Sequence, residues 1–178
     1  MSARFALLLL AWLAACAQPS VTWRNADGDA LPETGSVQSE DGFGGHIIVT
    51  SDADWREKWA TPADVAPTFH TVESVSQGEQ VFVLIFFANP SLDAAGAANV
   101  TCDIDLTRPD GTRSIEAEGV TAHQGVLAGS PFNTYLAAPV IEFVGEPDDL
   151  PGRWVVHVSL HDTQRPVTLE LTTSFVLR

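Results

Sequence analysis

Short runs of alternating or continuous apolar residues, separated by Gly-, Pro- and Asp-rich turns, dominate the chain after about residue 45. The strongest run is QVFVLIFFANP at 80–90, which is apolar on both sides when its side chains alternate as in a strand. Its two rows are Phe82, Leu84 and Phe86, the phenylalanine row, and Val81, Val83, Ile85 and Phe87, the valine row. A strand with two apolar rows needs cover on both faces.

A short helix is predicted earlier in the chain, in SDADWREKWATP at 51–62, directly after a short strand at 46–50. Ser51 is followed three residues later by Asp54, which is the spacing of a capping box, and about two helical turns should follow. Trp55 and Trp59 then share one helix face by the i, i+4 rule. We expect this pair to lie against the valine row. The alternative is that the two rings form an aromatic platform for a ligand.

Further strands are predicted at 21–24, 46–50, 99–107, 113–119, 140–144, 153–162 and 166–177. The turn RPDGT at 108–112 should join the strands at 99–107 and 113–119 into a hairpin. Many short strands, one small helix and no strand–helix–strand rhythm predict a mainly β protein, built as a single antiparallel β-sandwich.

Cys102 is expected to be a buried, unpaired thiol. It shares a strand face with Ile104 and Leu106, while Asp103 and Asp105 point to the other side. No basic residue is near it in sequence to lower its pKa, so a role as a small core residue is favoured over a reactive thiol.

The N-terminal segment has the layout of a bacterial export signal, with one basic residue and an apolar run that ends in small residues. Leu13-Ala14-Ala15-Cys16 resembles the bacterial lipobox, and the chain is identified on this basis as a bacterial lipoprotein. The resemblance implies a signal peptide over residues 1–15, acylation of Cys16 and, because Ala17 follows, retention in the outer membrane facing the periplasm. The alternative is ordinary cleavage after Ala17, which satisfies the small-x-small rule and yields a soluble periplasmic protein.

The Gly-, Pro- and acid-rich stretch at 16–45 is expected to be a tether, with one strand at Val21–Arg24, and residues 46–178 are expected to form the sandwich domain. The 178 residues suit one domain, and 45% hydrophobic residues can fill its core. The net charge of -14 repels phosphate backbones and anionic headgroups. Nucleic acid is therefore excluded as a partner, and membrane contact is expected only through lipid on Cys16.

His157 and His161, in HVSLH, are the strongest candidates for metal ligands. Residues i and i+4 of a strand lie about 13 Å apart, too far to share one ion. His46, His70 or His123 could complete a site only from neighbouring strands. We therefore expect no metal and no cofactor. Together with Trp55 and Trp59, the two histidines are candidates for a partner surface.

No segment has a catalytic signature; Gly129-Ser130, for example, lacks the framing of a nucleophile elbow. VFVLIFF, RPDG and EPDDLPGRWVVHVSLHD, within 81–177, resemble bacterial extracytoplasmic immunoglobulin-like domains. The resemblance implies an immunoglobulin-like sandwich and transfers no activity. The expected function is a non-catalytic, lipid-anchored binding or assembly module with an envelope protein as partner. The alternative is a soluble periplasmic protein that binds a metal or a small ligand.

Overall fold

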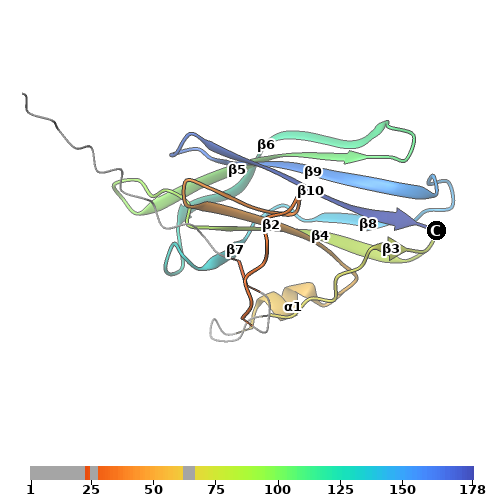
Figure 1. Cartoon of the computed structure of the whole chain (residues 1–178), viewed down its shortest axis with the longest axis horizontal. Coiled ribbons are helices and arrows are strands. Elements are labelled where there is room, and N and C mark those ends of the chain that lie inside the picture. Colours follow the sequence, from red (N-terminus) through yellow and green to blue (C-terminus); the bar gives the residue numbers. More distant parts are fainter. Residues whose placement is uncertain (1–22, 25–27, 62–66) are drawn as a thin grey trace, which may run out of the picture.

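The computed structural model describes residues 23–24, 28–61 and 67–178, and this part of the chain is a two-layer β-sandwich with one short helix (Figure 1). Its elements are β1 (Val37–Glu40), β2 (Phe43–Thr50), α1 (Trp55–Trp59), β3 (Ser74–Val75), β4 (Gln80–Ala88), β5 (Ala97–Thr107), β6 (Arg113–Val126), β7 (Thr134–Leu136), β8 (Ile141–Val144), β9 (Gly152–Asp162) and β10 (Val167–Leu177). The expected mainly β sandwich is confirmed.

Each layer is one sheet. In the first sheet the order is β1-β2-β4-β7, and β8 also pairs with β4 beyond the end of β7. In the second sheet the order is β3-β10-β9-β5-β6. The strand pairs are antiparallel except for β3 with β10, so the second sheet is mixed rather than purely antiparallel. The expected RPDGT hairpin joins β5 and β6, with Gly111 N donating to Arg108 O at 2.9 Å.

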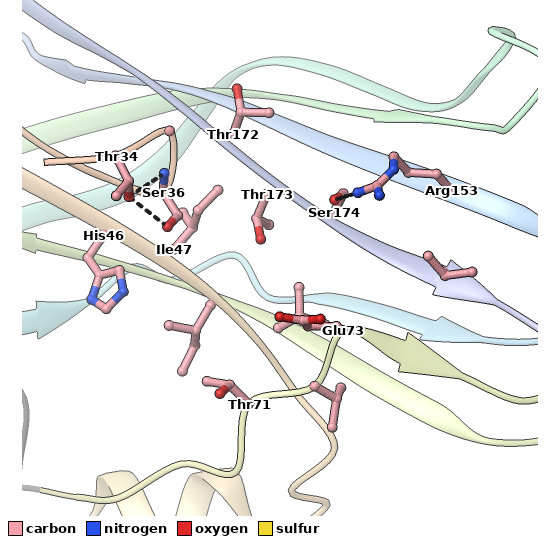
Figure 2. Close-up of a pocket in the computed structure, with 15 residues that line it drawn as sticks. Thr34, Ser36, His46, Ile47, Thr71, Glu73, Arg153, Thr172, Thr173 and Ser174 are labelled. Atoms are coloured by element: carbon pink, nitrogen blue, oxygen red, sulfur yellow. Dashed lines mark hydrogen bonds between the residues drawn. The ribbon is translucent and has the colours of Figure 1, made fainter. Parts of the chain in front are cut away.

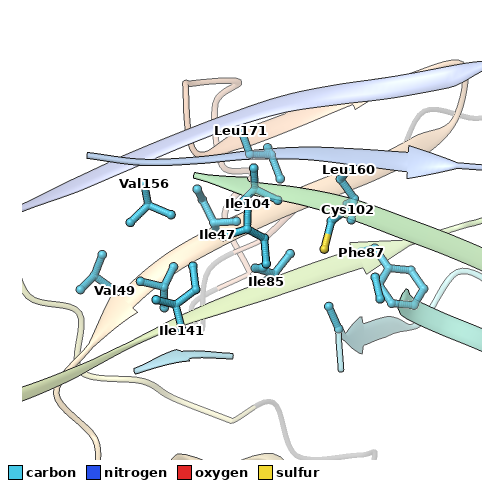
Figure 3. Close-up of a cluster of buried hydrophobic side chains, with 14 of the residues drawn as sticks. Ile47, Val49, Ile85, Phe87, Cys102, Ile104, Ile141, Val156, Leu160 and Leu171 are labelled. Carbon is cyan, nitrogen blue, oxygen red and sulfur yellow. The ribbon is translucent and has the colours of Figure 1, made fainter. Parts of the chain in front are cut away.

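The main core lies between the two sheets, where the valine row of β4 meets the inward faces of β5, β9 and β10 (Figure 3). The inward faces of β5 and β9 carry Val100, Cys102, Ile104, Val156 and Leu160, among others. Cys102 is fully buried and unpaired, as expected, and burial raises the pKa of its thiol to about 11. A thiol with this pKa stays protonated and unreactive at neutral pH.

A second hydrophobic cluster covers the outer face of the first sheet. Helix α1 lies on this face (Figure 1), with the ring of Trp55 6.2 Å from Phe82 and that of Trp59 5.4 Å from Phe86. The helix therefore covers the phenylalanine row, and the expectation that it covers the valine row is wrong. Both rows are equally apolar, so their sequence could not show which one faces the second sheet.

The start of α1 also differs from the prediction. Asp54 is the N-cap residue and makes no side-chain capping bond, and the helix has five residues rather than two full turns. Ser51 instead lies with its hydroxyl 3.2 Å from His70 Nδ1, and Asp52 accepts the His70 N–H at 2.8 Å. The capping box is therefore absent, because Ser51 and Asp52, which precede the helix, bond to His70, which follows it.

The sandwich begins earlier than the expected boundary at residue 46. Strand β1 pairs with β2 from Val37↔His46 to Glu40↔Phe43, so residues 37–45 belong to the first sheet and not to a tether. Of the strand expected at 21–24, Arg24 forms only an isolated bridge with Ala30, and Trp23 is buried but belongs to no strand. Residues 21–22, the leader and Cys16 lie outside the described residues. Among the described residues, no helix combines the length and apolarity needed to cross a bilayer.

Candidate functional site

Two short segments bridge the two sheets along one open side of the sandwich. The first bridge is residues 34–36, where Ile47 N donates to Ser36 O at 2.9 Å and Thr172 N donates to Gly35 O at 2.5 Å. The second bridge is residues 71–73, where Val72 N donates to Val49 O at 3.0 Å and Val176 N donates to Glu73 O at 2.9 Å. Each bridge therefore bonds to the edge of β2 and to the edge of β10.

Between the two bridges the seam between β2 and β10 is open, and a groove of about 580 Å³ lies there (Figure 2). We call it the seam groove. Its hydroxyl side chains are Thr34, Ser36, Thr71, Thr172, Thr173 and Ser174. Its aliphatic side chains are Ile47, Ile48, Val49, Val72 and Val176, and its remaining lining residues are Gly35, His46, Glu73 and Arg153. A volume of this size falls within the range of about 300–1,000 Å³ that is usual for small-ligand sites.

Residue 173 explains why the groove is open. Along β10 the inward positions 167, 169, 171, 175 and 177 are buried and apolar, whereas Thr173 occupies the inward position between Leu171 and Phe175 and is only half-buried. Its hydroxyl cannot be sealed in a dry core without a hydrogen-bond partner. The polar run Thr172-Thr173-Ser174, which interrupts the apolar alternation of this strand, is therefore the signal in the sequence for this site.

Arg153 is the only Arg or Lys among the described residues that line the groove. It extends from β9 toward Ser174 and donates from Nη1 to the Ser174 hydroxyl at 2.7 Å (Figure 2). Glu73, on the second bridge, is the only carboxylate among these described lining residues. Among the described residues Arg153 makes no ion pair with a carboxylate, so its guanidinium retains N–H donors for a ligand.

His46 lies where the seam groove meets the outer hydrophobic cluster. Its ring is 5.5 Å from that of Trp23 and 6.2 Å from that of Phe86. This burial lowers the pKa of His46 from 6.5 to about 4, because the apolar surroundings disfavour the imidazolium. At neutral pH the imidazole is uncharged.

The depressed pKa predicts an acid-sensitive fold. The folded state binds the His46 proton only near pH 4, while the unfolded chain binds it near pH 6.5, so stability is complete above pH 6.5 and falls as the pH drops toward 4. The expected loss across this window is up to about 3 kcal/mol. Chemical denaturation at several pH values should show this slope in the wild type and not in His46→Gln. His70→Gln, at an exposed position, should keep it, and a flat wild-type profile above pH 4.5 would contradict the assignment.

The four residues named as a candidate partner surface do not form one surface. Trp55 and Trp59 lie on the outer face of the first sheet, where Trp55 is buried and Trp59 half-buried. His157 and His161 point outward from β9 in the second sheet, on the opposite side of the sandwich. The structure therefore separates the aromatic pair from the histidine pair.

Each of the two histidines on β9 has its own carboxylate neighbour. His157 Nε2 lies 3.2 Å from Glu170 Oε2, and His161 Nε2 lies 3.1 Å from Asp103 Oδ2. The pKa of Asp103 lies below its usual value. The main cause is the hydrogen bond that the carboxylate accepts from the Gly119 N–H, and the contact of the carboxylate with His161 lowers the pKa further. No group of three or more His, Cys, Asp or Glu side chains within 23–24, 28–61 and 67–178 is arranged to hold a metal ion.

Comparison with known proteins identifies no family, since no family model and no curated protein matches the chain. Among solved structures, it is similar to a Pseudomonas fluorescens alkylpurine DNA glycosylase, AlkC, at 16% identity and a TM-score of 0.37 over 75% of this chain and 29% of that one. It is similar to a Clostridium perfringens family 123 glycoside hydrolase at 10% identity and a TM-score of 0.42, over 76% and 27%. A Niemann-Pick type C2 protein from the Japanese carpenter ant matches at 11% identity and a TM-score of 0.33, over 74% and 89%.

The first two of these proteins are much larger than the matched region, because the chain spans less than a third of either one. All three TM-scores lie below 0.5. These likenesses therefore transfer no activity to this chain.

Proposed function

We propose that this chain is a non-catalytic, lipid-anchored binding or assembly module on the periplasmic face of a bacterial outer membrane. The observation that carries the proposal is Leu13-Ala14-Ala15-Cys16, a lipobox-like sequence at the end of an apolar leader, in a chain that continues into a β-sandwich. Acylation of Cys16 would supply the membrane contact that a net charge of -14 otherwise disfavours. The proposal assigns no catalytic residue and no cofactor.

The packing of Trp23 supports a short connection between anchor and domain. Trp23 is buried against His46 on the outer face of the first sheet, and it comes seven residues after Cys16. Seven residues span at most about 25 Å when fully extended. In this proposal the face that carries α1 is therefore held near the bilayer, while the outward face of β9 is directed toward the periplasm and an envelope protein partner.

The alternative, a soluble periplasmic protein that binds a small ligand, differs from the first proposal in the fate of Cys16. Its supporting observation is the seam groove, which has the volume and mixed lining of a small-ligand site. The two proposals share the groove, so the location of the mature protein distinguishes them.

Replacing Cys16 is predicted to release the protein from the membrane. Wild-type protein carrying a C-terminal tag should sediment with outer membranes. Cys16→Ser should move to the soluble fraction, because it removes the residue that carries the acyl chains on which stable anchoring depends. Cys102→Ala is the matched control, since it removes the buried thiol and leaves the leader unchanged. An intact mass that begins at unmodified Gln18 would contradict anchoring and support the soluble alternative.

A partner can be sought with the same strains. The tagged wild-type protein should be cross-linked in cells, purified in detergent and compared with Cys16→Ser. We expect an envelope protein to co-purify with the wild type at constant stoichiometry. Less of that partner should be recovered with Cys16→Ser, which is released from the membrane. Recovery of the module alone from both strains would contradict a role in assembly.

A further inference from the structure

The seam groove is lined by side chains that both donate and accept hydrogen bonds. Six residues with hydroxyl side chains line it, from both bridges and from β10, where Thr173 faces inward and Thr172 and Ser174 face the opposite side of the strand. Aliphatic side chains of β2 and the second bridge, including Ile48 and Val72, supply apolar surface between these hydroxyls. A ligand that carries several hydroxyl groups on an aliphatic ring matches both features, because its hydroxyls exchange hydrogen bonds while its C–H faces pack on the aliphatic surface.

Arg153 adds a charge requirement. Several other basic side chains are already engaged: Lys58, Arg113 and Arg165 lie close to carboxylates, and Arg56 lies 4.2 Å above the ring of Trp55. Within the described residues, Arg153 instead forms its one side-chain hydrogen bond with a neutral hydroxyl, although acidic residues outnumber basic ones by 23 to 9 in this chain. A guanidinium in this position is suited to a carboxylate, which it can bind through two parallel hydrogen bonds.

We propose that the seam groove binds a polyhydroxylated carboxylate, a uronic acid unit, with Arg153 holding the carboxylate and the Thr and Ser hydroxyls holding the ring hydroxyls. This inference rests on the proposed function, because it names the ligand of the binding module. Glu73, across the groove, accepts hydrogen bonds from ring hydroxyls. Arg153 is the cationic side chain of the described lining, so the carboxylate of the ligand binds there and away from Glu73. A phosphate group carries more negative charge than one guanidinium balances, so the acidic chain disfavours it.

The binding test uses the full-length protein purified in detergent and four probes, with calorimetry as the readout. D-glucuronate should bind saturably. Glucose lacks the carboxylate and acetate lacks the hydroxyls, so each should bind at least tenfold more weakly. A trigalacturonate then distinguishes the source of the ligand. Binding at least as tight as that of glucuronate indicates a polysaccharide chain, and much weaker binding indicates a free sugar acid; either result supports the uronate site.

Matched variants locate the binding. Arg153→Gln should weaken glucuronate binding at least tenfold, while Arg178→Gln, an equal charge change outside the groove, should leave it unchanged. Thr173→Val keeps the side-chain shape, removes one hydroxyl and should weaken binding about three- to tenfold. Both groove variants should melt within a few degrees of the wild type, since neither removes a buried apolar group.

Three results would overturn the ligand assignment. They are no saturable binding of either uronate at millimolar concentrations, acetate binding as tight as that of glucuronate, or wild-type affinity in Arg153→Gln. If any of these results is obtained while the wild-type protein still sediments with membranes, the uronate site is rejected and the proposal of a lipid-anchored module is unaffected. Uronate binding by a protein whose Cys16 is not acylated would support the site and reject the anchor.

Discussion

Trp55→Ala is expected to lower the free energy of unfolding by about 3–5 kcal/mol, the usual range for a large aromatic residue removed from a core. Trp55 is the buried residue of α1, only 6% exposed, and it packs on Phe82 in the outer hydrophobic cluster. Removing the ring exposes the phenylalanine row of β4 to water and leaves α1 with no buried side chain. Urea denaturation followed by circular dichroism measures the loss.

Two further variants show which property of the ring matters. The indole Nε1 of Trp55 is buried and makes no hydrogen bond, so Trp55→Phe removes an unsatisfied donor together with some volume. It should cost less than about 1.5 kcal/mol, as a conservative apolar change does. Trp59→Ala, at a half-buried position, should cost less than Trp55→Ala. If Trp55→Phe were as destabilising as Trp55→Ala, the indole N–H would be bonded and this account of the cluster would fail.

Asp162→Ala is expected to have an effect of similar size, about 3–5 kcal/mol, because it breaks a buried charged network. The Asp162 side chain is fully buried at the end of β9 and accepts the Ser91 N–H at 2.7 Å. Arg165 Nε lies 3.5 Å from the same carboxylate and donates to the Ser91 hydroxyl at 2.9 Å. The guanidinium of Arg165 also donates to the carbonyl of Asp41, in the turn between β1 and β2. The network therefore joins loops of both sheets at one end of the sandwich.

Removing the carboxylate would leave the partly buried Ser91 N–H without its acceptor. It would also leave the Arg165 guanidinium without its carboxylate, although the neutral Ser91 hydroxyl and Asp41 carbonyl would still accept from it. The matched control is Asp110→Ala, which also removes an acceptor of a backbone N–H, at 2.9 Å from Thr112 N, but in the exposed β5–β6 turn. The control should cost no more than about 1 kcal/mol. Equal effects of the two changes in thermal and urea unfolding would show that the network at the end of the sandwich contributes no more than an ordinary turn bond.

Much of the secondary structure and one half of the core followed from local patterns. The alternation in β5, β9 and β10 was enough to predict which side chains face inward, because a strand projects successive side chains to opposite faces. The burial of Cys102 followed from the same alternation. The Asp-Gly turn between β5 and β6 was also readable, since Gly111 adopts a positive φ of 84° that few other residues tolerate.

Patterns without a polar side were ambiguous. In β4 both rows are apolar, and only the position of the second sheet decides that the valine row is inside and the phenylalanine row lies under α1. The strand β1 was hidden for a related reason. VQSE has one strongly apolar residue, so its place in the sheet comes from its register with β2 and not from its own composition.

The sequence by itself determined the class of the fold, the inward faces of the long strands, the acidic surface and the lipobox-like Cys16, because each depends on residues close together in the chain. The seam groove depends on the tertiary structure. Its bridges at 34–36 and 71–73 meet β10 at 172 and 176, about 100 or more residues further along, and Arg153 joins from β9. Only the docking of the two sheets brings those hydroxyls, the guanidinium and Glu73 to one opening, since no local pattern records which strand edges lie side by side.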